Sequence, residues 1–274
     1  MHIQFIRRRT GRRETRNALL LVGVSLLSFA TGVTAVAASA KPVPVKAASA
    51  VLTPEARAAL TAMGAYLRSL KSFEVTAEGT GDQVTLTGQT IEYGAQLHYS
   101  VVLPDRMYAE ISTGSRVREL FYDGLKLTIS APDTGYYADA PLNGSLGVLL
   151  ERASTEYDID LPLHQLFRWG DAARPTAWPS SGYKVGTAHC GKATCDQYAF
   201  RQPGLDWQLW IEQGAKPLPV RVVYTGTLDK ARPQIAANLA WTANPAIPAT
   251  RFAFTPTDGA SRIAIKKSTP AGGK

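Results

Sequence analysis

The spacing of apolar residues along the chain changes from the period of a helix to that of a β-strand. Leu60, Met63, Leu67 and Leu70 recur at intervals of three and four residues, which puts them on one face of a helix. The preceding segment Thr53–Glu55 supplies an N-cap residue, a proline at the first helical position and an acid in the first turn. The pattern therefore predicts an amphipathic helix that packs its apolar face on the rest of the fold.

From Phe73 to Ala140 apolar and polar residues alternate, as they do in half-buried strands. Short turns separate these runs and no helical crossover lies between them, which favours an antiparallel meander over a parallel α/β sheet. Asp123-Gly124 lies between two apolar runs and predicts a hairpin with a two-residue type I′ turn, which needs positive φ at both residues. The predicted strands are 73–80, 83–88, 90–104, 106–113, 116–122, 125–131 and 136–140.

Two short apolar segments interrupt the strand pattern after Pro141, and each predicts a short helix: Ser145–Ser154 and Pro162–Trp169. They are the candidates to cover the open face of the meander. Strands are predicted again over 183–188, 195–202, 206–213, 218–227, 234–243 and 251–256, with a short edge strand within 261–265.

The N-terminal residues predict a secretory signal peptide over residues 1–40. Six arginines and one glutamate precede an apolar run that starts at Ala18, and small-residue cleavage sites end at Ala37 and Ala40. A retained membrane anchor is the weaker interpretation, because Gly, Ser and Thr interrupt the run. We therefore expect export to the periplasm, by a Sec or twin-arginine route, cleavage near Ala37 or Ala40, and no stable membrane anchor afterwards.

Removal of the leader changes what the charge implies. Five of the +8 net charges lie in residues 1–40, so the remaining chain carries about +3 and gives no reason to expect nucleic-acid binding. The residues after Ala40 are enough for one large all-β domain. We expect a flexible linker at 41–52, one domain at 53–267 and a flexible tail at 268–274.

The two cysteines, Cys190 and Cys195, flank a turn-like GKAT segment. In an oxidising compartment this spacing predicts a disulfide across a hairpin. A redox or metal-binding pair is the alternative, but C-x-x-C spacing is absent and only His189 lies nearby as another ligand type. A structural disulfide is the favoured interpretation.

Motifs for catalysis are absent from the sequence. His98, His164 and His189 have no metal-ligand spacing, and neither a phosphate-binding loop nor a zinc-protease motif occurs. Ser181–Lys184 matches S-x-x-K, but it lies in a loop and lacks the partner motifs of that chemistry. We predict no enzymatic activity, no cofactor and no metal.

Several longer segments resemble a known superfamily. SLKSFEVTAEGT, LPDRMYAEI, LFYDGLKLTISAPDTGYY and RFAFTPTDGASRIAI are similar to LolA/LolB-like lipoprotein carriers. DWQLWIEQGAKPLPVRVVYT, with the two cysteines before it, resembles the DUF2092 family of exported bacterial proteins within that superfamily. The resemblance implies a mainly β (α+β) fold: an unclosed antiparallel β-barrel of about eleven strands, with an N-terminal helix and short lid helices on the concave face.

In such carriers the cavity between sheet and lid holds lipid acyl chains. Carried over by position, the resemblance assigns ligand binding to six lid residues: Leu146, Leu149, Leu150, Leu163, Leu166 and Phe167. The cavity-lining strand residues cannot be named, because sequence does not fix the register. The carriers also keep an arginine before the proline of an early turn, where this chain has Leu103 before Pro104 and Arg106 after the turn. Lipoprotein handoff is therefore not expected to follow the carriers' pattern.

Three functions are compatible with these observations. The first is a non-catalytic periplasmic protein that binds or carries a lipid or other hydrophobic ligand in the half-barrel cavity. The second is an envelope protein-interaction or sensor module that uses the same fold, with strand addition at the exposed sheet edges. The third is an exported enzyme, which no motif supports. In the simplest structural alternative, the lid residues fill the concavity and leave no cavity for a ligand.

Overall fold

The computed structural model describes residues 51–172 and 176–267 of the 274-residue chain. The predicted signal peptide, most of the predicted linker and the predicted tail at 268–274 lie outside the described residues. The helices within them are α1 (Pro54–Ser69), α2 (Leu146–Tyr157) and the 3-10 helices η1 (His164–Phe167) and η2 (Ala249–Phe252). The strands are β1 (Ser72–Val84), β2 (Thr90–Val102), β3 (Arg106–Thr113), β4 (Arg116–Tyr122), β5 (Lys126–Ala131), β6 (Tyr136–Pro141), β7 (Ser181–Cys190), β8 (Ala193–Gln202), β9 (Leu205–Glu212), β10 (Pro219–Gly226), β11 (Gln234–Ala243) and β12 (Ser261–Arg262).

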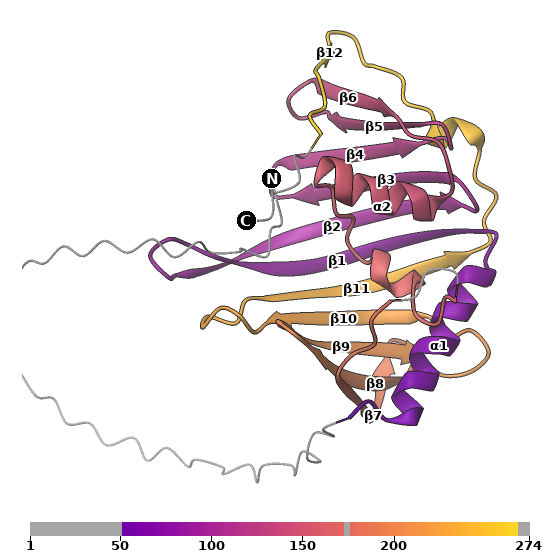
Figure 1. The fold of residues 1–274 in the computed structure, drawn as a ribbon, viewed down its shortest axis with the longest axis vertical. Helices are drawn as coiled ribbons and strands as arrows, with labels where there is room; N and C mark the ends of the chain where they lie inside the picture. The colour runs from indigo at the N-terminus through magenta and orange to yellow at the C-terminus, as the bar shows by residue number, and fades with distance from the viewer. Residues whose placement is uncertain (1–50, 173–175, 268–274) are drawn as a thin grey trace, which may run out of the picture. The chain divides into compact units, whose positions relative to one another are not determined.

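All twelve strands form one sheet, in the order β12-β6-β5-β4-β3-β2-β1-β11-β10-β9-β8-β7. The sheet consists of two consecutive meanders, β1–β6 and β7–β11, which meet where β1 pairs with β11 (Figure 1). Every pairing is antiparallel except the short parallel bridge of β12 to β6. The ends of this order do not pair with each other, so the barrel is unclosed, as the sequence predicted.

The alternation of side chains along β1 defines the two faces of the sheet. Val75 is buried and is paired with Tyr99 of β2 and Trp241 of β11, whereas its neighbours Glu74 and Thr76 point to the other side. We call the face that carries Val75 and Tyr99 the inner face. Helices α1, α2 and η1 all lie against it (Figure 1), and their apolar residues share one buried cluster with the sheet.

Helix α1 forms as the apolar spacing predicts. The Thr53 Oγ1 atom accepts a hydrogen bond from the Ala56 backbone at 3.2 Å, and Leu60, Met63 and Leu67 are fully buried. Gly64 on the same face allows the close approach of the backbone at Trp169, because a Cβ atom there would lie 2.1 Å from the Trp169 carbonyl oxygen.

The C-terminal segment crosses the outer face of the sheet. It leaves β11 beside the start of β1, where the Ser72 hydroxyl donates to the Pro245 carbonyl oxygen at 2.7 Å. The Phe254 ring then packs on Phe121 and Tyr137, with centroids 5.2 and 4.9 Å apart. The segment ends in β12, which pairs with β6. This strap buries aromatic side chains that the outer face would otherwise expose.

Several local predictions need correction. The predicted strands 73–80 and 83–88 form one continuous strand, β1, and the predicted strand 251–256 is wrong, because this region contains η2 and irregular strap. The predicted helix Pro162–Trp169 is only the four-residue η1. At the β4–β5 hairpin Gly124 has positive φ and Asp123 does not, so the type I′ assignment is wrong. Asp123 instead accepts hydrogen bonds from the backbone of Leu125 and Lys126 through its side chain, which closes a three-residue connection.

Candidate functional site

The inner face of β1–β6 is apolar where α2 packs on it, and it carries Arg116 and Arg118 at the opposite ends of the strands. Leu149 and Ala153 lie one turn apart on α2, and both are completely buried. Leu149 belongs to a buried cluster that includes Tyr99 of β2 and Leu120 and Leu127 of β4 and β5. The helix therefore acts as a cover for this half of the sheet, as the sequence predicted.

Hydrogen bonds hold the start of α2 at the end of the sheet that carries the β2–β3 and β4–β5 turns. The Leu146 backbone donates to the Pro104 carbonyl oxygen at 2.8 Å, and the Gly144 backbone donates to the Gly124 carbonyl oxygen at 3.2 Å. The Tyr122 hydroxyl also donates to the Gly144 carbonyl oxygen at 2.7 Å. Pro104 follows Leu103, the residue that the sequence resemblance compares with an arginine of lipoprotein carriers. In this chain a backbone hydrogen bond at the same turn holds the cover.

The second part of the cover is η1 with the residues on either side of it. Leu166 is buried in the core, and the Trp169 ring stacks on Trp207 of β9 with centroids 5.6 Å apart. The Tyr99 hydroxyl, reaching up from β2, donates to the Pro162 carbonyl oxygen at 2.8 Å. Burial raises the pKa of Tyr99, so this group stays protonated and donates over the whole physiological range.

A cluster of charges ties the C-terminal end of α2 to Lys267. Arg152 and Glu156 form an ion pair one turn apart, and the Lys267 Nζ atom donates to Glu156 Oε2 at 2.8 Å. These hydrogen bonds from Arg152 and Lys267 lower the pKa of Glu156 to about 2. We call α2, η1 and the connection between them the lid, residues 146–167.

The structure places five of the six predicted ligand-binding residues on the sheet side of the lid. Leu149 and Leu166 are fully buried, while Leu146, Leu150 and Leu163 are half-buried and pack on the same cluster. The side chain of the sixth, Phe167, lies outside the described part of the structure. These five leucines pack on the buried cluster of the inner face. Their role in binding a ligand stays a prediction.

The inner face continues beyond the lid toward the opposite ends of the strands. There Ile111 and Ile129 are half-buried, while Tyr93 and Tyr136 are 43% and 49% exposed. Register places all four side chains on the same face as Tyr99. Sequence alone missed this open end of the inner face, because a shift of one residue in pairing would have put these side chains on the outer face.

His164 is the histidine within the lid, and its Nδ1 atom lies 2.6 Å from the Leu161 carbonyl oxygen. Within the described ranges no group of three metal-ligating side chains occurs. His98 lies on the outer face beside Glu74 and Arg251. Cys190 and Cys195 form a disulfide across the β7–β8 hairpin with Cα atoms 6.0 Å apart, which confirms the predicted pairing.

A family model described as "Predicted periplasmic protein (DUF2092)" matches residues 56–266. The chain belongs to the DUF2092 family. The match covers both meanders and the lid, so the family model extends over the whole sheet described above. A comparison with curated proteins found no match. None of the helices in the described part of this DUF2092 chain is long and apolar enough to cross a membrane.

Solved structures similar to this DUF2092 chain have low sequence identity. An uncharacterised conserved protein from Thermus thermophilus is 11% identical, with 77% of this chain and 99% of that chain covered and a TM-score of 0.44. The lipoprotein LppX from Mycobacterium tuberculosis is 13% identical, with coverage of 72% and 98% and a TM-score of 0.36. A LolA superfamily protein from Nitrosomonas europaea is 9% identical, with coverage of 72% and 97% and a TM-score of 0.35. At such low identity, a ligand for this chain has to be inferred from its own residues.

Proposed function

We propose that this protein is exported to the periplasm and binds or carries a lipid or other hydrophobic ligand between the inner face and the lid, without catalysis. The observation that carries the proposal is the apolar inner face, which extends from the lid past Ile111 and Ile129. The open end also carries Arg116 and Arg118. One end is covered by Leu149 and Leu166 of the lid, and the other end is open at Tyr93 and Tyr136. An elongated apolar ligand fits such a face, because it can enter at the open end and replace the lid's contacts.

The way in which the lid is attached supports this proposal. The contacts that hold it include apolar side chains, single hydrogen bonds at Pro104 and Pro162, and the ion pair of Glu156 with Lys267. Asp158, in the left-handed conformation, ends α2 and begins the connection to η1. An acyl chain that replaces Leu149 and Leu166 against the sheet exchanges one apolar surface for another, so the transfer costs little free energy.

Mass spectrometry of lipid extracted from the purified protein tests the proposal. We expect an acyl-containing ligand in stoichiometric amount. A purified protein that carries no ligand and also fails to bind an apolar fluorescent probe would overturn it.

Substitutions in the lid locate the ligand. Leu149→Asp and Leu166→Asp are expected to abolish probe binding, because each puts a charge against the inner face. Leu150→Asp provides the same test at a half-buried position, where less packing is lost. Leu86→Asp is the matched control, since Leu86 is fully exposed at the β1–β2 hairpin. Probe binding that persists in folded lid variants, as judged by circular dichroism, would remove the lid from the site.

Export has its own measurement. The family is described as predicted periplasmic, and the leader pattern places cleavage after Ala37 or Ala40. We expect the intact mass of the protein from the periplasmic fraction to match a chain that begins at residue 38 or 41. A full-length mass in the membrane fraction would contradict cleavage.

The alternative, an envelope protein-interaction or sensor module, has one feature in its favour. Strand β7 is an edge of the sheet, and Val185 on it is 44% exposed. In the described part of the chain only the bridge of Leu52 to Gly182 pairs along this edge. A partner strand would add there. Specific capture of an envelope protein that Val185→Lys abolishes, with no ligand in the extract, would favour this alternative.

A further inference from the structure

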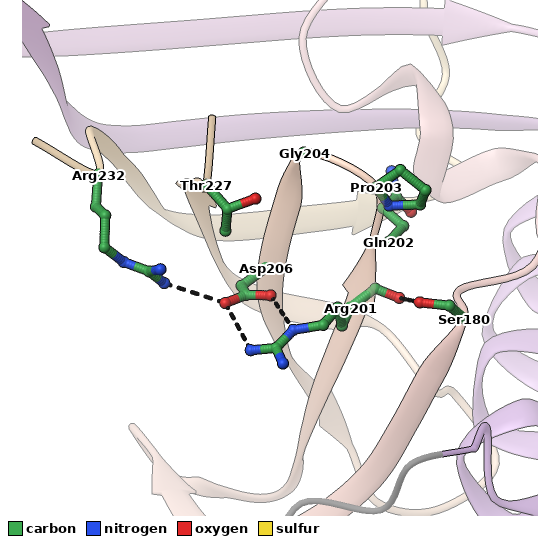
Figure 2. Close-up of a pocket in the computed structure, with 8 residues that line it drawn as sticks. All are labelled: Ser180, Arg201, Gln202, Pro203, Gly204, Asp206, Thr227 and Arg232. Atoms are coloured by element: carbon green, nitrogen blue, oxygen red, sulfur yellow. Dashed lines mark hydrogen bonds and ion pairs between the residues drawn. The ribbon is translucent and has the colours of Figure 1, made fainter. Parts of the chain in front are cut away.

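A hollow of about 480 Å³ lies at the strand ends away from the start of α2. It is formed where the β8–β9 turn meets the β10–β11 loop, and its polar lining includes Ser180, Arg201, Asp206, Thr227 and Arg232 (Figure 2). Arg201 and Asp206 alternate with the inner-face residues Phe200 and Trp207, so the hollow belongs to the outer side of the sheet.

Two arginines converge in this hollow on one carboxylate. Arg201 donates to Asp206 through Nε at 2.6 Å and Nη2 at 3.0 Å, and Arg232 donates through Nη2 at 3.1 Å. Figure 2 shows the two guanidinium groups reaching Asp206 from different directions. Hydrogen bonds from Arg201 and Arg232 lower the pKa of Asp206, so it stays ionised and holds both groups in place.

The arrangement leaves a net positive charge and unused donors. Two guanidinium groups face one carboxylate, so the cluster carries one excess positive charge. Among the described residues, Arg201 Nη1 and Arg232 Nε and Nη1 take part in none of the hydrogen bonds that fix the cluster. Planar guanidinium groups with free donors are the side chains that match the oxygens of a phosphate.

Exposed leucines stand beside the hollow. Leu228 is 87% exposed in the β10–β11 loop, and its Cδ1 atom is 3.2 Å from the position of a Cβ atom on Gly204, which lines the hollow. Leu86 is fully exposed at the tip of the β1–β2 hairpin. The two loops are neighbours, because the Gln234 backbone donates to Asp82 Oδ2 at 2.9 Å across β11 and β1. Leucines at loop tips next to cations fit the interface of a bilayer.

We propose that the Arg201–Asp206–Arg232 hollow binds the phosphate of an anionic phospholipid headgroup and docks this end of the protein on a bilayer. The guanidinium donors outside the Asp206 hydrogen bonds take the phosphate, and Leu228 and Leu86 enter the interfacial layer. Asp229 and Lys230 in the same loop balance each other in charge. The site goes beyond the proposed ligand function, since it lies outside the inner face and needs no ligand there.

Vesicle co-sedimentation tests this docking with protein purified from the periplasmic fraction. We expect binding to vesicles of phosphatidylcholine that contain phosphatidylglycerol, weaker binding at high salt, and little binding to pure phosphatidylcholine. The double variant Arg201→Gln/Arg232→Gln is expected to bind the anionic vesicles roughly thirty-fold more weakly, the effect of two basic residues at an anionic surface. Leu228→Ser is expected to weaken binding as well.

The matched control is Lys71→Gln/Arg106→Gln. It removes the same charge from two exposed residues at the opposite ends of the strands, and it is expected to bind like the unmodified protein. An equal loss in both double variants, or no loss in the arginine variant, would overturn the site. Titration with inorganic phosphate separates the sources of the anion: tight phosphate binding with no vesicle binding would overturn the membrane assignment.

The same variants separate this proposal from the proposed function. Arg201→Gln/Arg232→Gln is expected to bind an apolar probe normally, because the hollow lies on the other side of the sheet. A protein without an acyl ligand that still binds anionic vesicles through these arginines would reject the ligand function and keep the docking site.

Discussion

At the scale of single residues, the contacts that hold the lid come from side chains whose role their sequence position does not reveal. Tyr99 looks like an ordinary strand residue, yet its ring is in the core and its hydroxyl group holds Pro162. The leucines of the lid were predictable from their spacing. The hydrogen bond of Tyr99 was not, because it joins residues that only the folded sheet brings together.

Tyr99→Phe should loosen the lid while leaving the sheet intact. The variant keeps the buried ring and loses one hydrogen bond, so we expect a loss of about 1 kcal/mol in the free energy of unfolding. Amide hydrogen exchange in residues 158–169 should become faster. Tyr108→Phe is the control: it removes hydroxyl bonds to Glu110 and Glu119 on the outer face, and exchange in the lid should not change. Equal exchange in both variants would contradict the role of Tyr99.

Glu156 should make the attachment of α2 to Lys267 sensitive to acid. Its pKa in the folded protein is about 2, below the ordinary value of 4.5, because Arg152 and Lys267 hydrogen-bond to the carboxylate. The stabilising contribution is therefore complete above about pH 4.5 and is lost as the pH falls through about 2. Unfolding by denaturant at a series of pH values measures it.

We expect Glu156→Gln to be less stable than the unmodified protein near neutral pH, with the difference disappearing in strong acid. Glu151→Gln, an exposed neighbour on the same helix, should show no such difference. A constant difference at every pH would mean that packing, and not charge, is what Glu156 contributes.

At the scale of elements, period and turn chemistry predicted most strands, while pairing decided the details. Strand β1 runs through Gly81, where the sequence suggested a turn, because β2 and β11 pair with it on both sides there. The apolar residues of 251–256 look like a strand, but they cover outer-face aromatic residues as a strap. Alternation alone does not distinguish a strand from a segment that packs its side chains across a sheet.

The β7–β8 hairpin owes part of its stability to the Cys190–Cys195 disulfide. Its loop is short, so on the chain-entropy model the bond contributes about 2 kcal/mol. Cys190→Ser/Cys195→Ser should lower the free energy of unfolding by this amount, and a reductant should lower that of the unmodified protein equally. A reductant that destabilises the serine variant too would show that the effect is unrelated to this bond. Two free thiols in periplasmic protein would contradict the bond itself.

At the scale of the whole molecule, both meanders contribute to one core. Val75 of β1, Leu127 of β5 and Leu209 of β9 belong to the same buried cluster, together with Leu60 of α1. The resemblance of short motifs in the right order predicted this architecture. It did not reveal that the meanders meet at β1 and β11, because no local pattern encodes a pairing between such distant residues.

A shared core predicts cooperative unfolding. The five tryptophans all lie between residues 169 and 241, so tryptophan fluorescence reports the second half of the chain. We expect it to change at the same denaturant concentration as the far-ultraviolet circular dichroism of the whole sheet. Two separate transitions would show that the meanders are independent units joined only at the β1–β11 seam.

The position of β1 has a consequence for how the chain is made. It is the first strand of the described residues to be synthesised, yet it lies in the middle of the finished sheet, and its partner β11 follows about 150 residues later. Strands β1–β6 each pair with the next strand along the chain, so their hairpins can form one after another during synthesis. Until β11 is made, β1 has an unpaired edge, the kind of surface through which incompletely folded chains aggregate. During folding, the pairing of β1 with β11 therefore competes with the pairing of β1 with a strand of another molecule.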